Sequence, residues 1–174
     1  MTKDSRHDFT FWALQGPGWL LFLYLVYAQG ISAFSYDIGV AMGTQESSAA
    51  ITEVGAAFWY GFAFGDLVAY IPLLFIGLIG HLRNTRWGEV ALAAALGITF
   101  YWPIVSLAAL VHARGATGWL IKSEAPYWAV CLSISAWGLW ALATILTGSF
   151  RIASETTRAT QSCKGPKSLR NFVL

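Results

Sequence analysis

Residues 54–80 read VGAAFWYGFAFGDLVAYIPLLFIGLIG, and this stretch decides the fold that the sequence predicts. Asp66 is its single charged side chain. A helix needs about 20 consecutive apolar residues to cross the hydrocarbon core of a bilayer, and this stretch is long enough. Because only a helix satisfies all of its own backbone hydrogen bonds in lipid, residues 54–80 are predicted to form a transmembrane helix and not a strand.

Three other stretches have the same apolar character. The four predicted spans cover residues of about 12–34, 54–80, 88–111 and 126–150. The whole chain is 56% hydrophobic and 11% charged, whereas soluble domains carry roughly 25% charged residues. A soluble fold would lack the polar side chains to cover itself. We therefore predict an all-α, integral membrane four-helix bundle within residues 1–150, followed by a basic cytoplasmic tail over residues 151–174.

The distribution of charge predicts how this bundle is oriented. The loop between the first two spans contains three acidic residues and no Lys or Arg: Asp37, Glu46 and Glu53. The turn between spans two and three contains Arg83 and Arg86, and the tail is also basic. Because basic residues stay on the cytoplasmic side, both termini are predicted to be cytoplasmic, in a multi-pass protein of a bacterial inner membrane. Arg114 and Lys122, in the third loop, count mildly against this orientation.

Asp66 is the only ionisable side chain deep inside a predicted span. A charged Asp at the centre of a bilayer costs on the order of 3 kcal/mol, and such residues usually face the interior of a bundle. Tyr70 comes one turn later on the same helix face. By depth, Asp66 is level with Thr99 and Tyr101 of the third span, so these two are its candidate hydrogen-bond partners. Asp66 then either holds helices together or serves as a proton or ligand site.

Two prolines and a group of aromatic residues extend this candidate site. Pro72 and Pro103 lie inside spans two and three, where each removes a backbone hydrogen bond and predicts a kink. Kinks at these positions would open space beside Asp66. A polar, aromatic-lined pocket is therefore predicted there, or else tight helix packing with serine hydrogen bonds. The remaining side chains expected in this pocket are Tyr101, Trp102, Ser133, Ser135, Trp137 and Trp140.

The second span and the loop before it contain further features, most of which have more than one interpretation. Gly61 and Gly65 form a GxxxG pair, which predicts a close helix contact within the chain, with dimerisation as the alternative. The outer-mouth acids Asp37, Glu46 and Glu53 could form a cation-binding patch or simply a solvated acidic loop. A serine at position 47 or 48, or Thr52, is placed to cap the second span.

The absence of several motifs argues against other kinds of site. His81 and His112 fall at opposite ends of the predicted bundle, and no HExxH or paired-cysteine motif is present, so we predict no metal site and no cofactor. A GxSxG nucleophile motif is also absent. The bases form no stripe that would suit nucleic acid.

Three classes of function remain. The first is a non-catalytic accessory subunit of a membrane complex, or a hydrophobic-ligand-binding protein, favoured because catalytic groups are scarce. The second is a proton-linked small-molecule transporter using Asp66. The third, which we rank last, is a membrane-embedded enzyme on a lipid-like substrate, with acid and base groups from Asp66, Tyr70, Tyr101, Glu46 or Glu53. The expected partners are membrane lipid and either other membrane subunits or a hydrophobic ligand.

Overall fold

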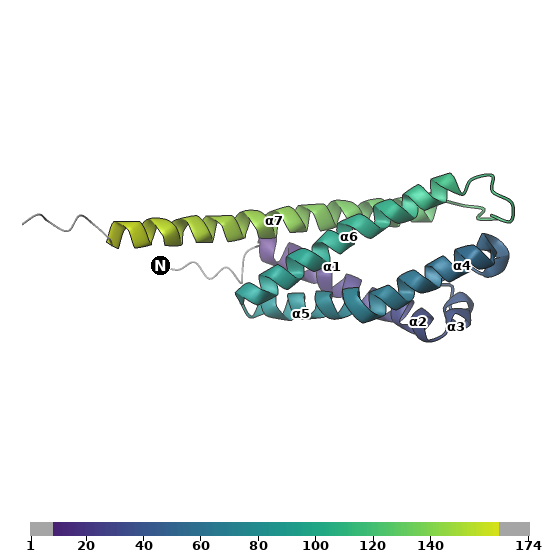
Figure 1. Ribbon diagram of the computed structural model, residues 1–174, viewed down its shortest axis with the longest axis horizontal. Coiled ribbons are helices and arrows are strands. Elements are labelled where there is room, and N and C mark those ends of the chain that lie inside the picture. The colour runs from purple at the N-terminus through teal and green to yellow at the C-terminus, as the bar shows by residue number, and fades with distance from the viewer. Residues whose placement is uncertain (1–8, 164–174) are drawn as a thin grey trace, which may run out of the picture.

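The computed structural model describes residues 9–163, with side chains described as far as residue 148, and every regular element in this part of the chain is a helix (Figure 1). Seven α-helices and two π-helical segments succeed one another: α1 (Phe9–Leu25), η2 (Val26–Gly30), α2 (Ile31–Phe34), α3 (Tyr36–Ala41), α4 (Ser48–Gly65), η3 (Asp66–Tyr70), α5 (Ile71–Leu82), α6 (Arg86–His112) and α7 (Ala125–Cys163). The predicted all-α class is confirmed for the described residues.

Four helical stretches are long and apolar enough to cross a membrane, which agrees with the four predicted spans. They are Phe9–Phe34, Ser48–Leu82, Arg86–His112 and Ala125–Gly148. The first two each consist of α-helices joined through a π-helical segment. Helix α7 continues to Cys163, past the predicted end of the fourth span, and the rest of the predicted tail lies outside the described residues. These lengths and compositions suggest a multi-pass membrane protein.

The connections gather at two ends of an elongated molecule (Figure 1). Residues 35–47, which include α3, lie at the same end as the connection 113–124 between α6 and α7, and we call this the loop end. The start of α1 and the turn 83–85 between α5 and α6 lie towards the opposite end, which we call the terminal end. Successive long helices therefore run in alternating directions.

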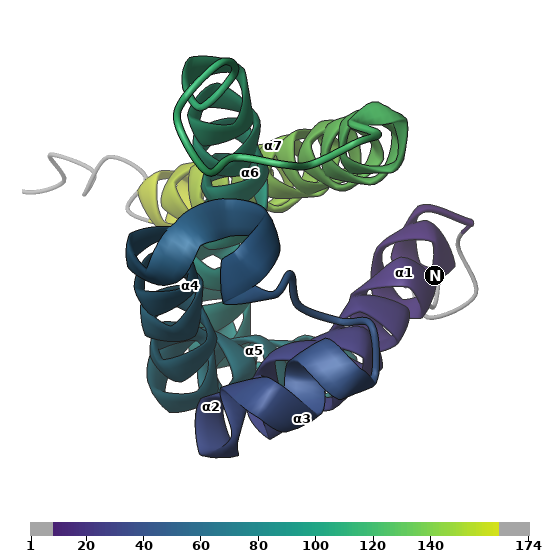
Figure 2. The same ribbon diagram turned by 90° about the vertical axis from the view of Figure 1, so that its right-hand side faces the viewer.

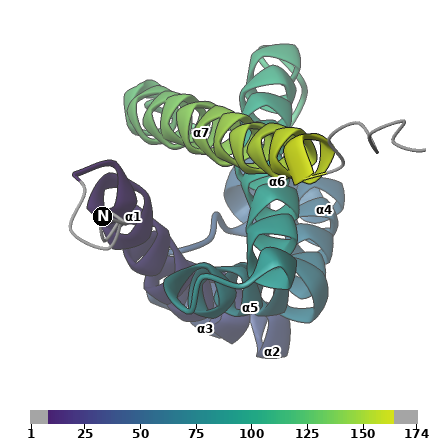
Figure 3. The same ribbon diagram turned by 90° about the vertical axis from the view of Figure 1, so that its left-hand side faces the viewer.

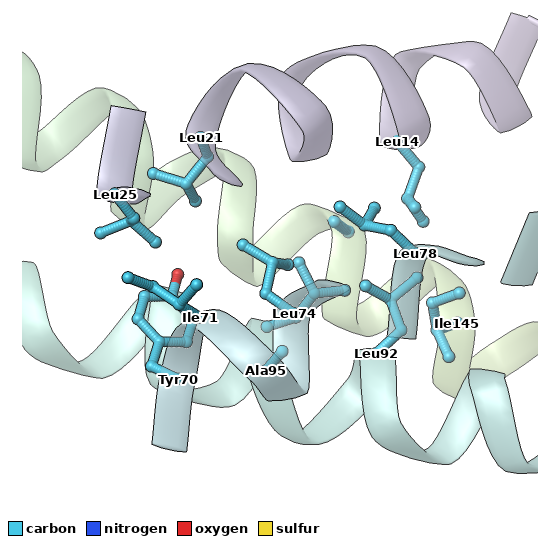
Figure 4. Packing of buried hydrophobic residues seen from close by; sticks show 12 residues of the cluster. Leu14, Leu21, Leu25, Tyr70, Ile71, Leu74, Leu78, Leu92, Ala95 and Ile145 are labelled. Carbon is cyan, nitrogen blue, oxygen red and sulfur yellow. The ribbon is translucent and has the colours of Figure 1, made fainter. Parts of the chain in front are cut away.

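Helix α6 is the centre of the packing. It packs along both α5 and α7, while α1 packs on α5. Seen from the two ends, α1, α5, α6 and α7 succeed one another around the molecule (Figures 2 and 3), and α4 extends beyond α5 towards the loop end (Figure 1). The main core forms where α1, α5, α6 and α7 meet, and includes the fully buried side chains of Leu74, Leu78 and Leu92 (Figure 4). The Leu96 side chain is fully buried in the same core.

Glycines bring α5 and α6 into close contact. A Cβ at Gly77 would lie 2.7 Å from the Cα of Leu92, and Gly80 and Gly88 are packed against each other so closely that neither position has room for one. Small residues permit this kind of approach between helices in membranes. The predicted contact of Gly61 and Gly65 within the chain is wrong, because both face outward with nothing within 4 Å of an added Cβ.

The two π-helical segments contact each other in the middle of the bundle. Residues 26–30 of the first span pack against residues 66–70 of the second. Pro72 is the second residue of α5, which follows η3, so the irregular backbone of span two lies where its kink was predicted. Pro103, in contrast, is buried within the continuous helix α6. Such π-helical turns occur frequently at functional sites, which makes the contact between the two segments a candidate position for a functional site.

Candidate functional site

Asp66 does not have the partners that its depth predicted. Its carboxyl makes no hydrogen bond or ion pair with residues 9–148. Thr99 instead bonds to Tyr70, at 2.6 Å between the two hydroxyl oxygens, and it also donates to the carbonyl of Ala95 at 2.9 Å. Because Thr99 has one hydroxyl hydrogen, Tyr70 must be the donor in the first bond. Both side chains are buried, so this pair joins α6 to the η3 segment.

The aromatic residues predicted around Asp66 are dispersed. Tyr101 is 64% exposed, so its side chain points away from the bundle and cannot be a partner of Asp66. The indole nitrogen of Trp137 donates to the carbonyl of Ala13 at 3.1 Å and thereby ties α7 to α1. The Trp102 ring is partly buried, and its enclosed indole nitrogen lies near the Tyr70 hydroxyl and makes no hydrogen bond to Asp66. The predicted pocket around Asp66 is therefore not formed by these residues.

The serines of span four and Trp140 also fail to converge there. Ser135 donates to the carbonyl of Phe100 at 3.0 Å, which links α7 to α6, whereas Ser133 donates to the carbonyl one turn earlier in its own helix. Trp140 is 42% exposed. The alternative of helix packing with serine hydrogen bonds describes this region better.

A cavity of about 330 Å³ lies instead at the loop end, where residues of all four spans and residues 43–46 line it. Its wall combines aromatic, polar and small side chains: Tyr24, Gln29, Gly43, Thr44, Gln45, Glu46, Trp59, Trp102, Ser106, Pro126, Tyr127, Val130 and Cys131. Tyr24 and Val130 are each about half exposed, at 47% and 48%. Lining residues on α1 and on α7 therefore also reach the molecular surface.

The connection between α3 and α4 folds back over this cavity. We call residues 42–47 the covering segment. The carbonyl of Gly39 accepts hydrogen bonds from the backbone N–H groups of Thr44 and Gln45, at 3.0 and 3.3 Å, and from the Thr44 hydroxyl at 3.1 Å. The Tyr36 hydroxyl donates to the carbonyl of Glu46 at 2.8 Å. These bonds give a loop without regular structure a defined conformation.

Side chains of the covering segment also reach two spans. Gln45 donates to the side-chain oxygen of Gln29 in η2, at 3.1 Å. The Tyr127 hydroxyl, in the first turn of α7, donates to the Glu46 carboxylate. Burial, and to a smaller extent the charge of Glu46, raises the pKa of Tyr36 above its ordinary value of 10.0, so this phenol remains a donor. The covering segment therefore connects the first span to the fourth across the cavity.

The three outer-mouth acids do not act together. Only Glu46 lines the cavity, while Asp37 and Glu53 are exposed on other surfaces. The described residues contain no group of three or more His, Cys, Asp or Glu side chains that could hold a metal ion. The predicted cation-binding patch of Asp37, Glu46 and Glu53 is therefore not formed, and Glu46 alone remains a candidate.

The connection between α6 and α7 supports the same end of the molecule. Leu120 N–H donates to the carbonyl of Ala50 at 2.7 Å, which ties this connection to the start of α4. Arg114 and Glu124 form an exposed two-point ion pair, which lowers the pKa of Glu124 from 4.5 to about 2, mainly through the hydrogen bond from Arg114. The Trp128 indole also donates to Glu124, at 3.3 Å.

Thr52 marks a break within α4. Its backbone has φ 70° and ψ 163°, a conformation that costs free energy for a β-branched residue. Its hydroxyl accepts the backbone N–H of Gly55 at 3.2 Å, so the prediction that Thr52 caps the second span is confirmed. Ser47 makes no such side-chain bond. The continuous helix of the second span therefore begins after Thr52.

An apolar groove of about 360 Å³ adjoins the cavity. It lies between α4 and α6 and shares four lining residues with the cavity: Trp59, Ser106, Tyr127 and Cys131. The other lining residues are almost entirely apolar, and include Phe58, Phe62, Leu107, Leu110 and Trp119. The cavity, whose wall includes polar side chains, and the apolar groove therefore lie side by side.

Several residues of this site were not singled out from the sequence. Tyr24, Gln29 and Tyr127 carry no motif; Tyr127 lies near the end of a span, where aromatic side chains are ordinary, and Tyr24 lies inside the first span. Trp102 and Glu46 were predicted as site residues, but in two separate sites. The one signal in the sequence was that Gln29 is a polar residue within the first apolar stretch.

Comparison of the chain with protein-family models, with curated proteins and with solved structures finds no match.

Proposed function

We propose that this protein is a non-catalytic membrane protein that binds a hydrophobic ligand between its helices at the loop end. The observation that carries the proposal is the cavity of about 330 Å³ that adjoins an apolar groove of about 360 Å³ and shares four lining residues with it. Small-molecule sites are typically concave, mostly apolar and lined by a few well-placed polar groups. The second form of this hypothesis, an accessory subunit of a larger membrane complex, stays a prediction.

The position of the cavity also supports a ligand taken from the bilayer. Its rim residues Tyr24 and Val130 are half exposed on the surfaces of the first and fourth spans. A ligand could therefore enter sideways from lipid, without crossing the covering segment. Nothing comparable supports catalysis at Asp66, because the Tyr70 hydroxyl is engaged with Thr99 and Tyr101 points outward.

A direct test uses substitutions that fill the site. Val130→Trp would place an indole in the mouth of the cavity, while Ala129→Trp changes the neighbouring exposed residue, which lines neither the cavity nor the groove. We expect the wild-type protein, isolated in mild detergent, to carry an apolar molecule detectable by mass spectrometry. Val130→Trp should lose it and Ala129→Trp should keep it. A ligand-free wild-type protein, or equal retention by both variants, would contradict the proposal.

A second pair of variants tests the groove independently. Ala109 lines the groove and Ala108, next to it on α6, does not, although both are exposed. Ala109→Phe should reduce ligand retention and Ala108→Phe should not. An effect in both variants would indicate general damage to α6 and not a filled groove.

We propose further that the protein is inserted in a bacterial inner membrane as a four-span bundle with both termini cytoplasmic. Support comes from Arg83 and Arg86 at the terminal end and from the base-free loop between the first two spans at the loop end. In a background without cysteine, a membrane-impermeant maleimide added to intact cells should label Ser123→Cys and not Asn84→Cys. The reverse pattern would overturn the orientation.

The environment of Asp66 supports a second candidate function, a proton-linked small-molecule transporter. Asp66 begins the η3 segment, which packs on the η2 segment, and its carboxyl has no hydrogen-bond partner among residues 9–148. An unpaired carboxyl on an irregular helical segment within a span is suited to gaining and losing a proton during a conformational change. Asp66→Asn should then abolish flux in proteoliposomes while the protein stays folded. Since four spans are few for a transporter, a strictly monomeric state would argue against this candidate.

A further inference from the structure

The chemistry of the cavity wall indicates which kind of ligand headgroup it accepts. Glu46 is the only charged side chain among the residues that line the cavity. No Lys, Arg or His lines it. Two bases, Arg114 and Lys122, lie in the connection before α7; Arg114 is paired with Glu124, and neither base lines the cavity.

The carboxylate of Glu46 therefore lacks a compensating positive charge in the cavity wall. Its side-chain partner is the hydroxyl of Tyr127, a neutral donor. A carboxylate that is partly removed from water and has no cationic partner attracts a cation and repels an anion. A ligand with a carboxylate, phosphate or sulfate headgroup would be disfavoured at this position.

Four aromatic side chains line the same cavity as this acid. Tyr24, Trp59, Trp102 and Tyr127 come from the first, second, third and fourth spans, respectively. The faces of aromatic rings attract cations, most strongly those of Trp, and cages of such rings are the usual means by which proteins bind quaternary ammonium groups. A carboxylate within an aromatic wall fits an organic ammonium better than it fits a neutral polar headgroup.

A metal cation fits the same wall poorly. The described residues contain no group of three or more potential His, Cys, Asp or Glu ligands. Calcium and magnesium need six or more oxygen ligands, supplied mainly by carboxylates, carbonyl groups and water. A single carboxylate among tryptophan and tyrosine rings does not meet that need, whereas an alkylammonium group requires no coordination sphere.

The neighbouring groove provides for the remainder of such a ligand. Its lining is almost free of polar surface, and it meets the cavity at Trp59 and Tyr127. An alkyl chain attached to an ammonium group could lie there between α4 and α6. We infer that the site binds a cationic amphiphile, with its ammonium group at Glu46 among the four aromatic rings and its apolar chain in the groove; this inference rests on the ligand-binding function proposed above.

The test compares three probes that share one alkyl chain. Decyltrimethylammonium is cationic, decanoate anionic and decyl glucoside neutral. Binding is measured by the quenching of tryptophan fluorescence in lipid nanodiscs, with a correction for each probe's partition into empty discs. We expect the cation to bind about tenfold more tightly than either of the others, which is the effect of one favourable cation–aromatic contact. Glu46→Gln should remove most of this preference, while Glu53→Gln, an exposed acid outside the cavity, should leave it unchanged.

The outcomes separate this inference from the proposed function. Equal binding of all three probes, abolished by Ala109→Phe but not by Ala108→Phe, would overturn the cationic headgroup while supporting the hydrophobic-ligand site. Preferential binding of the cation that Glu46→Gln does not change would also overturn it. Failure of every probe to bind the wild-type protein would overturn both the headgroup and the proposed function.

Discussion

Tyr127, in the first turn of α7, donates a hydrogen bond to the carboxylate of Glu46, in the covering segment, across a sequence separation of 81 residues. The bond closes the loop end of the molecule, because the same segment is also tied to the first span through Gln45 and Gln29. It joins distant parts of the chain at the cavity where we place the ligand. Its loss should therefore affect the covering segment before it affects the helices.

Tyr127→Phe tests this expectation. Hydrogen bonds to charged groups contribute about 1.5–3 kcal/mol, and a partly exposed one such as this should lie at the low end of that range. We expect the amides of Thr44 and Gln45, both bonded to the carbonyl of Gly39, to exchange about tenfold faster with deuterium. Hydrogen exchange monitored by mass spectrometry measures this.

The control for this variant is Tyr101→Phe, which removes a hydroxyl from a tyrosine that is 64% exposed. It should leave exchange in the covering segment unchanged. If Tyr127→Phe also left it unchanged, the bonds to Gly39 and Gln29 would be sufficient to hold the segment, and Glu46 would owe its position to the loop alone.

The buried hydroxyl pair of Tyr70 and Thr99 makes a second prediction. Thr99→Val removes the acceptor of the Tyr70 hydroxyl, which is enclosed and shielded from water. We expect unfolding in mixed micelles to become easier by about 1 kcal/mol, since an unsatisfied buried donor costs about 1–3 kcal/mol and hydrogen bonds within membranes average near the low end. Adding Tyr70→Phe should then cost little more, because the orphaned hydroxyl is gone.

Thr147→Val is the matched control for this pair. Thr147 bonds within its own helix to the carbonyl of Ala143 at 2.9 Å and is exposed, so its replacement should change stability far less. Additive losses in the Thr99→Val and Tyr70→Phe double variant would show that the two hydroxyls act separately, contrary to the expectation.

The ion pair of Arg114 and Glu124 predicts a dependence on pH. Its hydrogen bonds lower the pKa of the folded-state Glu124 from 4.5 to about 2. The pKa of Glu124 is lower in the folded protein than in the unfolded protein. The ion pair therefore stabilises the fold fully above about pH 4.5, and this stabilisation is lost as the pH falls from 4.5 through about 2. In the wild-type protein, the carboxyl chemical shift of Glu124, followed by nuclear magnetic resonance as the pH is lowered, should report a pKa of about 2.

Arg114→Gln should return the pKa of Glu124 most of the way to 4.5, since the hydrogen bond from Arg114 is the largest cause of the shift. Lys122→Gln removes another base from the same connection and should have little effect. As both partners are at the surface, the change in stability itself should be small and reduced by salt. A Glu124 pKa that is unchanged by Arg114→Gln would mean that the pair does not persist in solution.

The sequence predicted the helical spans well because length and apolar composition alone determine them. It placed Asp66 level with Thr99 and placed Tyr70 one turn beyond Asp66, and in the structure Tyr70 is the residue that meets Thr99. Depth, however, does not determine which face of a helix a residue occupies. A π-helical turn contains an extra residue and so rotates the helix beyond it, and η3 begins at Asp66 itself. This rotation explains why the depth argument found the right level but assigned the wrong partner to Thr99.

The site at the loop end was harder to predict for a different reason. Glu46 and Tyr127 meet only because the covering segment folds back on Gly39, and no local pattern encodes a bond between two loop-end residues so distant in sequence. The glycine contacts show the same limit. Gly61 and Gly65 match a motif but face outward, while Gly77, without a motif, lies against the backbone of Leu92. Spacing within one helix does not reveal which face its neighbour covers.

Gly77 therefore makes the sharpest prediction about packing. A Cβ there would lie 2.7 Å from both the Cα and the backbone nitrogen of Leu92, which are parts of α6 that no side-chain rotation can move. Gly77→Ala should destabilise the protein by about 1–3 kcal/mol, the usual cost of overpacking, in unfolding from mixed micelles. Gly97→Ala, in the interior of α6 with nothing within 4 Å of the added Cβ, should be neutral or stabilising by about 0.5–1 kcal/mol. Equal effects of the two substitutions would contradict the close contact of α5 with α6, on which the alignment of the bundle depends.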